Sequence, residues 1–218
     1  MPQEPSRLGG SRHAVELFGR SSSHFTRVTR IFALELGVPH AFRPVFDLTS
    51  LDPATYAGNP ALKLPILVDE AGPLFGTENI CRALLRHSEN ATGPVVLRGD
   101  VQNRVVANAE ELTLHAMSSE VSLIMAKAAG AQHLPPPKVP QSLQNALRFL
   151  DENLDNALAA LPPDRAFSFV EVALFCVTTH LGFREVLDVT SFRRLADFCA
   201  GFGERKSARA TPYRFDAE

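Results

Sequence analysis

Hydrophobic and polar residues follow different patterns in the two halves of the chain. Residues 13–87 mix short alternating or apolar runs, which predict strands, with stretches of helical periodicity. Strands are expected at 13–18, 41–48, 66–68 and 73–75, and helices at 25–36 and 77–87. The order is β-α-β followed by β-β-α, which predicts a thioredoxin-like α/β domain.

Single residues mark the limits of several of these elements. Gly37 follows the first helical stretch and predicts its end, because glycine readily adopts the left-handed conformation that closes many helices. Pro44 lies inside the second predicted strand, and since proline cannot donate to a strand ladder, this strand is expected at a sheet edge. At most a short helix is expected after Pro53, and residues 69–72 predict a hairpin-like turn.

The second half of the chain shows helical periodicity without strand signals. Helical stretches are expected at 100–129 (as one long helix or two broken ones), 142–161, 169–182 and 191–202. Ser168 and Glu171 have the spacing of a capping box at the start of the third stretch. We therefore expect a flexible leader at 1–12, the thioredoxin-like domain at 13–87, a linker at 88–97 and an all-helical domain with a short tail at 98–218.

Composition and charge exclude several classes of partner. Of the 218 residues, 45% are hydrophobic and 21% charged, and the formal net charge is −2, so neither nucleic acid nor a membrane is an expected partner. Cys81, Cys176 and Cys199 are far apart in apolar helical patterns, which fits buried thiols in a reducing compartment. No apolar run is long enough to be a signal peptide or a membrane span, and we expect a cytoplasmic protein.

The segment Lys63-Leu64-Pro65-Ile66-Leu67-Val68 indicates a site for a short peptide. Its last three residues form a short apolar strand, and Pro65 at the entrance requires the chain to turn or open. A cis peptide bond between Leu64 and Pro65 would do this, since cis bonds cost little only before proline. The N–H and C=O of Leu64 would then face outward and pair with a peptide as an added strand.

A second segment, Thr77-Glu78-Asn79-Ile80, indicates where the ends of such a peptide would bind. Thr77 is expected to cap a helix that begins with Glu78 and Asn79. The free N–H groups of a helix N-terminus suit a carboxylate, and the Glu78 side chain beside them suits an ammonium group. Backbone pairing with an α-carboxylate and an α-amine describes the γ-glutamyl-cysteinyl part of glutathione.

Both segments resemble motifs of the soluble glutathione S-transferase family. Asn59-Pro60-x-x-Lys63-Leu64-Pro65-Ile66-Leu67 is similar to the family's N-P-x-(G)-K-V-P-V-L, and Thr77-Glu78-Asn79-Ile80 is similar to its T/S-E-S-x-A-I. The resemblance implies the glutathione transferase architecture, with glutathione as cosubstrate. By this resemblance Leu64 and Pro65 hold the cysteinyl part, Glu78 and Asn79 the γ-glutamyl end, and Lys63 the glycyl carboxylate.

The same resemblance implies which side chain activates the glutathione thiol. In the family this residue lies in the loop after the first strand, and here the corresponding loop, 19–25, has neither cysteine nor tyrosine. Ser23-His24-Phe25-Thr26-Arg27 is similar to the family's S-P-F-x-R and implies Ser23 as the catalytic residue. Whether Ser21, Ser22 or Ser23 faces the thiol stays open at this point.

The reaction implied is attack of the glutathione thiolate on a small hydrophobic electrophile bound between the two domains of a homodimer. Two alternatives stay open. One is a non-enzymatic binding or protein-interaction module with the same fold, and the other is a glutathione-dependent isomerase or dehalogenase, a branch that Arg20-Ser21-Ser22 resembles. The seven histidines show no spacing typical of metal ligands, so no metal is predicted.

Overall fold

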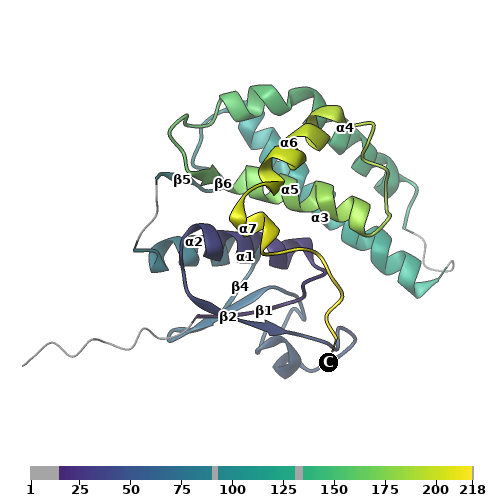
Figure 1. Ribbon diagram of the computed structural model, residues 1–218. Helices are drawn as coiled ribbons and strands as arrows, with labels where there is room; N and C mark the ends of the chain where they lie inside the picture. Colours follow the sequence, from purple (N-terminus) through teal and green to yellow (C-terminus); the bar gives the residue numbers. More distant parts are fainter. Residues whose placement is uncertain (1–14, 90–92, 131–134, 218) are drawn as a thin grey trace, which may run out of the picture.

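The computed structural model describes residues 15–89, 93–130 and 135–217. A four-stranded sheet forms the lower part of the molecule in Figure 1. Its strands are β1 (Val15–Gly19), β2 (His40–Pro44), β3 (Ile66–Asp69) and β4 (Gly72–Phe75), in the order β2-β1-β3-β4. β1 and β2 are parallel, whereas β3 is antiparallel to both of its neighbours. Pro44 thus lies in an edge strand, as predicted.

Helices α1 (His24–Glu35) and α2 (Thr77–His87) lie on one face of this sheet, between it and the C-terminal helices (Figure 1). α1 fully buries the hydrophobic positions whose helical spacing predicted it: Val28, Ile31 and Phe32. Gly37 has a φ of +63° just after this helix, as expected. With a short 3-10 helix η1 (Pro53–Tyr56) before β3, these elements confirm the thioredoxin-like N-terminal domain.

The end of β2 and the cap of α2 differ from the sequence-based expectation. β2 ends at Pro44 and does not reach Leu48, because its partner residue, Gly19, is the last residue of β1. α2 is capped by Gly76, with a φ of +89°, and Thr77 is its first helical residue. The leader 1–12 and the first two residues of the predicted strand 13–18 lie outside the described residues.

The C-terminal domain is helical, as predicted, and begins with a long helix. α3 (Arg104–Ala129) is continuous, and α4 (Lys138–Ala159), α5 (Phe169–Phe183), α6 (Arg193–Gly203) and α7 (Lys206–Arg209) follow. Ser168 caps α5, and its Oγ accepts the N–H of Glu171 at 3.2 Å. Within the described ranges no helix has both the length and the apolar character needed to cross a membrane.

Two short features of this domain were not predicted. α7 is a single turn, and the two-residue strands β5 (Val95–Val96) and β6 (Phe167–Ser168) pair in parallel. β5 lies within the stretch predicted as a linker, and its pairing with β6 holds Val95 and Val96 against the start of α5. The chain is therefore fixed to the helical domain before α3 begins.

Arg27 of α1 connects the two domains. Its side chain is buried between the rings of Phe175 and Tyr213, with the guanidinium carbon 4.6 and 4.3 Å from their centroids. Its nitrogens donate to Thr179 Oγ1 at 3.1 Å and to the Ala208 carbonyl at 3.2 Å. The first turn of α1 is thereby held against α5 and α7.

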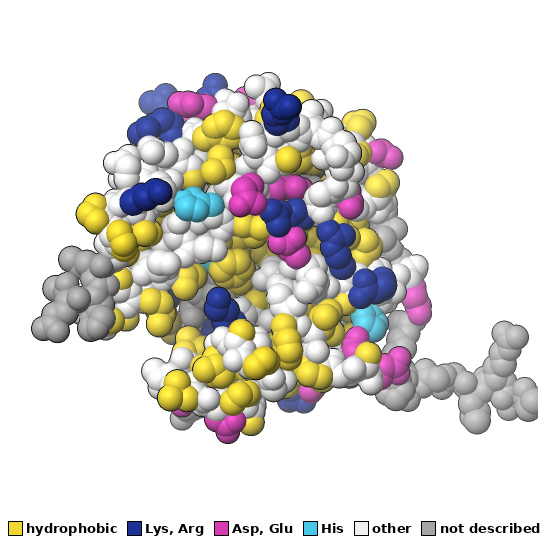
Figure 2. Space-filling view, turned by 180° about the vertical axis from the view of Figure 1, so that it is seen from behind, with side chains coloured by type: hydrophobic (Ala, Val, Ile, Leu, Met, Phe, Trp, Pro, Cys, Tyr) yellow, Lys and Arg dark blue, Asp and Glu magenta, His cyan; other side chains and the backbone are white. Residues whose placement is uncertain are grey.

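Several hydrophobic side chains remain exposed at the surface. In Figure 2 they gather on the lower, N-terminal part of the molecule and along the boundary between the two domains. Among the described residues, Leu48 and Leu51 after β2 are 50% and 85% exposed, and Val121 and Met125 on α3 are 39% and 59% exposed. Such side chains are candidates for contact with another molecule.

Candidate functional site

The register of the sheet brings three separate segments to one place. Ile66 of β3 pairs with Phe18 of β1 on one side and with Phe75 of β4 on the other. The loop before α1 follows Phe18, the Leu64–Pro65 bond precedes Ile66, and the start of α2 follows Phe75. Phe18, Ile66 and Phe75 thus form one row across three neighbouring strands, and each of the three sequence-predicted segments leaves the sheet next to this row.

The loop between β1 and α1 packs closely against the helix that follows. A Cβ atom on Gly19 would lie only 2.3 Å from Thr26 Cγ2 and 2.6 Å from Thr26 Oγ1, so only glycine fits there without a shift. The Arg20 N–H donates to Thr26 Oγ1 at 3.3 Å. Arg20 itself reaches away from the loop and donates to the carbonyls of Val45 and Phe46.

The three serines of this loop have different surroundings. Ser21 and Ser22 are buried, at 3% and 9% exposure, whereas Ser23 is half-buried. Ser23 is the N-cap of α1, and its Oγ accepts the N–H of Thr26 at 3.3 Å. Its hydroxyl hydrogen remains available for a ligand, next to the partial positive charge of the helix N-terminus.

The peptide bond between Leu64 and Pro65 is cis, as predicted. The loop before it is shaped by Asn59, which is buried: its Nδ2 donates to the Lys63 carbonyl at 2.7 Å and its Oδ1 accepts the Ala61 N–H at 3.0 Å. Asn59 of the first motif thus holds the loop, while the Lys63 side chain is exposed.

The start of α2 follows Phe75, which pairs with Ile66 next to Pro65, but the side chains of Glu78 and Asn79 already have partners. Glu78 Oε1 accepts from Arg98 Nη1 at 3.2 Å, and the same guanidinium binds Glu111 at 2.6 Å. Asn79 Nδ2 donates to the carbonyl of Phe75 at 3.0 Å. Arg98, which lies just after β5, had no signal in the sequence motifs, and the fold brings it to Glu78.

Phenol and thiol groups of the described chain are poorly placed for activating a ligand thiol. Tyr56 is buried, and the hydroxyl of Tyr213 donates to the Cys176 carbonyl at 2.6 Å. Burial raises the pKa of the Cys176 and Cys199 thiols to about 12 and raises the pKa of the Cys81 thiol well above its usual value. All three thiols are free; Cys81 and Cys176 are buried, as the sequence predicts, whereas Cys199 is only half-buried.

Three buried polar residues lie directly beneath the loop and were missed by sequence reasoning. His24 of α1, Glu120 of α3 and His180 of α5 meet there, and His180 Nε2 donates to the Ser22 carbonyl at 2.8 Å. Burial lowers the pKa of His24. Burial alone would raise the pKa of Glu120, but the imidazoles of His180 and His24 beside it lower it below its usual value. No spacing rule links positions 24, 120 and 180, because they lie on three different helices.

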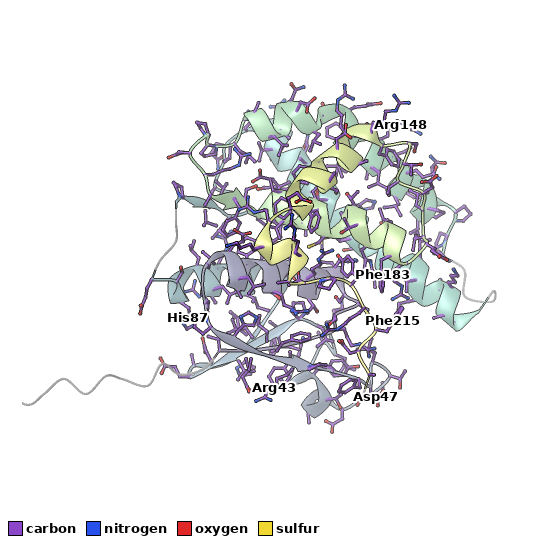
Figure 3. The ribbon with its side chains drawn as sticks, in the orientation of Figure 1. Arg43, Asp47, His87, Arg148, Phe183 and Phe215 are labelled. Carbon is purple, nitrogen blue, oxygen red and sulfur yellow. The ribbon has the colours of Figure 1, made fainter. Side chains whose placement is uncertain are left out.

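The C-terminal tail also reaches this loop. It descends from α7 along the N-terminal domain (Figure 1), and Asp216 Oδ2 accepts the Ser21 N–H at 2.7 Å. The Asp216 side chain is only 5% exposed. Figure 3 shows Phe215 on this tail close to Phe183 at the end of α5, and their ring centroids are 5.2 Å apart. The tail thus adds an aromatic surface beside the loop.

A comparison with protein-family models matches residues 17–92 to the glutathione S-transferase N-terminal domain. This stretch contains the loop with the three serines, the Leu64–Pro65 bond and the start of α2. A search of curated proteins finds no match.

Solved structures show a similar fold over more than nine tenths of the chain. The fold is similar to that of a glutathione S-transferase from Methylobacillus flagellatus with glutathione bound (TM-score 0.75, 20% identity, covering 92% of this chain and 100% of that chain). A glutathione S-transferase from Methylobacterium radiotolerans in complex with glutathione sulfonate has a TM-score of 0.72 at 19% identity, covering 94% and 98%. A glutathione transferase family member from Pseudomonas fluorescens Pf-5 with bound glutathione has a TM-score of 0.71 at 21% identity, covering 92% and 100%.

Proposed function

We propose that this chain is a soluble glutathione S-transferase that binds glutathione and transfers the thiolate to a small hydrophobic electrophile. Residues 17–92 match the glutathione S-transferase N-terminal domain, and the fold is similar to that of solved glutathione S-transferases. The observation that supports this most directly is the row of paired residues Phe18, Ile66 and Phe75. The Ser23 loop, the Leu64–Pro65 bond and the start of α2 leave the sheet next to this row, and in our proposal all three contact one ligand of peptide length.

Each part of glutathione has a proposed partner in this arrangement. The Leu64 backbone next to Pro65 pairs with the cysteinyl unit as an added strand. The first N–H groups of α2 and the Asn79 side chain bind the γ-glutamyl carboxylate, and Glu78 binds the γ-glutamyl ammonium group. Lys63, whose side chain is exposed, binds the glycyl carboxylate.

Ser23 is the proposed catalytic residue. Its hydroxyl would donate to the glutathione sulfur at the N-terminus of α1, where the helix dipole also favours negative charge. A free thiol has a pKa of about 8.5, and each unit by which it is lowered corresponds to about 1.4 kcal/mol of preferential stabilisation of the thiolate. Burial of Ser21 and Ser22 supports Ser23 over its two neighbours.

The electrophile would bind between the domains, next to this thiolate. The aromatic pair of Phe183 and Phe215 (Figure 3) offers an apolar surface there, and Phe215 is 64% exposed. α3 would line the other side, as the family resemblance implies.

We also propose a homodimer, in which a partner would cover exposed side chains such as Leu51 and Met125. We further propose a cytoplasmic location, which three free thiols suit.

A non-catalytic binding module is the second candidate, and specific contacts favour it. Glu78 is paired with Arg98, the Asn79 amide is bound to the Phe75 carbonyl, and the Ser21 N–H is bound to Asp216. Glutathione would have to compete with the first two contacts. The isomerase or dehalogenase alternative gains no such support, because Arg20 binds the carbonyls of the segment after β2 and Ser21 and Ser22 are buried.

Calorimetric titration with glutathione, run beside a conjugation assay with a chloronitrobenzene, tests the proposal. Binding in the micromolar to millimolar range together with turnover is the expected result. Binding of glutathione without turnover for a panel of electrophiles would favour the non-catalytic module. Absence of binding to both glutathione and S-methylglutathione would contradict the proposal.

A further inference from the structure

The polar cluster beneath the Ser23 loop consists of two imidazoles and one carboxylate in a buried space. His24 is the first residue of α1, Glu120 lies in the middle of α3, and His180 lies near the end of α5. Their exposed fractions are 1%, 0% and 3%. A charged side chain in such a place is normally paired or bound to a metal, because its burial costs free energy.

The ligand-type atoms of the cluster converge on one point. His24 Nδ1 and His180 Nδ1 lie 2.9 Å apart, His180 Nδ1 lies 2.8 Å from Glu120 Oε1, and His24 Nδ1 lies 3.3 Å from Glu120 Oε2. Each of these atoms can offer a lone pair, and the group lies within 4.8 Å overall. Three electron-pair donors are thus brought together from three helices.

The hydrogen bond to the loop determines which nitrogen of His180 is free. The Ser22 carbonyl can only accept, so His180 Nε2, 2.8 Å away, carries a hydrogen. In the neutral ring, His180 Nδ1 is then a bare lone pair facing the Glu120 carboxylate and His24 Nδ1. A metal-binding histidine typically has this arrangement, with one nitrogen toward the metal and the other donating to a carbonyl.

A cluster without a metal, in which hydrogen bonds alone join the three side chains, is less favourable than a metal-bound one. It requires either an imidazolium at His180, with one Nδ1–H shared between two acceptors, or a protonated Glu120. Both would be fully buried. Even so, Glu120 Oε2 is buried without a hydrogen-bond partner of normal geometry among the described residues, which is uncommon for polar atoms in protein interiors.

We propose that His24, Glu120 and His180 bind one divalent transition-metal cation of the zinc type through His24 Nδ1, His180 Nδ1 and the Glu120 carboxylate. Two imidazoles and a carboxylate suit zinc, whose bonds of about 2.0–2.1 Å place tetrahedral ligands about 3.3 Å apart. The three side chains need to separate by only a few tenths of an ångström. A water molecule would complete the coordination.

The location gives this cation a structural role. It joins α1, α3 and α5 directly below Ser22 and Ser23, and so fixes the loop of the N-terminal domain to the helical domain. Glutathione binding as proposed above does not involve these three side chains, so the metal site and the proposed function can fail independently. The sequence predicts no metal because its ligands are 96 and 60 residues apart and share no motif.

The full chain, purified from zinc-supplemented culture, provides the first test. We expect about one zinc per chain by elemental analysis, and a fall in Tm of about 5–10 °C when a chelator removes the zinc, since a ligand present at about a hundred times its Kd stabilises a chain of this size by that much. Adding zinc back should restore the Tm. Zinc-edge X-ray absorption of the wild-type protein should show nitrogen and oxygen ligands with scattering from two imidazoles.

Variants distinguish this site from adventitious binding. Glu120→Gln and His180→Gln should each weaken zinc affinity at least about 100-fold, since metal affinity falls 10–100-fold even when only a neighbour of a ligand is lost. His87→Gln is the matched control, because His87 also lies 2.9 Å from a carboxylate, that of Asp69, but at an exposed site. It should leave zinc affinity unchanged.

Three outcomes would overturn the proposal. The first is wild-type protein that binds no zinc and whose Tm responds to neither zinc nor chelator. The three side chains would then be joined by hydrogen bonds alone. The second is zinc that remains bound in Glu120→Gln and His180→Gln. The third, which needs no variant to fold, is an X-ray absorption spectrum without imidazole scattering.

Discussion

At the scale of single residues, the hydroxyl of Ser23 is the group that the proposed chemistry needs most. We expect Ser23→Ala to lower kcat/KM for conjugation at least about tenfold, while glutathione affinity changes less than about threefold, because the hydroxyl acts on the sulfur and not on the peptide backbone. Steady-state kinetics and calorimetry measure the two effects separately. Ser23→Thr keeps both the hydroxyl and the helix cap, and it should retain most of the activity.

The neighbouring serines serve as controls for this prediction. Ser21→Ala and Ser22→Ala should each affect conjugation less than Ser23→Ala, because both side chains are buried. A larger loss in Ser21→Ala than in Ser23→Ala would show that a different serine faces the thiol. Tm values for all variants separate a loss of chemistry from a loss of folding.

Glu78 tests the proposed contact with the γ-glutamyl ammonium group. Glu78→Gln keeps the size of the side chain and removes its charge. A charge-assisted hydrogen bond contributes about 1.5–3 kcal/mol, which corresponds to a ten- to hundredfold loss of glutathione affinity. We expect the lower end of this range, because Glu78 already shares its charge with Arg98.

Glu111→Gln is the matched control for Glu78. Glu111 also binds Arg98, at 2.6 Å, but its side chain is 70% exposed and belongs to α3. Its replacement should leave glutathione affinity within about twofold of the wild-type value in the same calorimetric titration. Equal losses in both variants would indicate that Arg98, and not Glu78, is the group that matters for the ligand.

At the scale of elements, the close approach of β1 and α1 positions the Ser23 loop. Gly19→Ala would place a methyl group 2.3 Å from Thr26 Cγ2, and the resulting shift of α1 should lower the free energy of unfolding by about 1–3 kcal/mol. Denaturant unfolding measures this loss. Adding Thr26→Ala removes the two nearest atoms, so the double variant should be less destabilised than the sum of the single variants. Additive losses would mean that the contact is not the cause.

The prediction of elements from the sequence succeeded where the signal is local. The helices α1 and α2 follow from hydrophobic spacing, the end of α1 follows from Gly37, and the edge position of β2 follows from Pro44. The sequence did not indicate where β2 ends, because its length depends on the last paired residue of β1. The β5–β6 pair joins residues more than 70 positions apart, and two-residue strands have no periodicity.

The candidate functional site also has parts that local sequence motifs predict and parts that they do not. The motifs around Pro65 and Glu78 are short and continuous in the sequence, and the sheet register brings them together. Arg98, Asp216 and the cluster of His24, Glu120 and His180 reach the same region from separate elements. Their positions depend on how the two domains pack, and a single sequence does not specify that packing through any local pattern.

At the scale of the whole molecule, the two domains are held together by charged side chains as well as by the hydrophobic core. Arg27 reaches from α1 into the aromatic surroundings of Phe175 and Tyr213, so this residue of the S-x-F-x-R segment joins the two domains. At the other end of α1, Arg205 binds both carboxylate oxygens of Glu35 at 2.9 Å and also donates to the Ala166 carbonyl. The Ser207 hydroxyl donates to Glu35 as well.

The contact between Glu35 and Arg205 makes stability dependent on pH. Burial alone would raise the pKa of Glu35, but the hydrogen bonds from Arg205 and Ser207 and the charge of Arg205 lower it below its usual value. A carboxyl whose pKa is lower in the folded state contributes stability above its unfolded pKa, about 4.3, and loses it as the pH falls through the folded value. Glu35→Gln should therefore lower the free energy of unfolding by about 1–2 kcal/mol at pH 7.

The same prediction requires this difference to disappear in acid. Below the folded pKa the wild-type Glu35 is protonated and resembles glutamine, so the unfolding free energies of wild type and Glu35→Gln should converge as the pH falls below about 4. Glu16→Gln is the control, because Glu16 also binds an arginine through two hydrogen bonds, yet its partner Arg43 is 58% exposed on the sheet. An exposed pair contributes less than about 1 kcal/mol. Urea unfolding at a series of pH values would contradict the assignment if Glu35→Gln cost as much in acid as at pH 7, because the loss would then come from packing and not from the charge that joins α1 to the C-terminal domain.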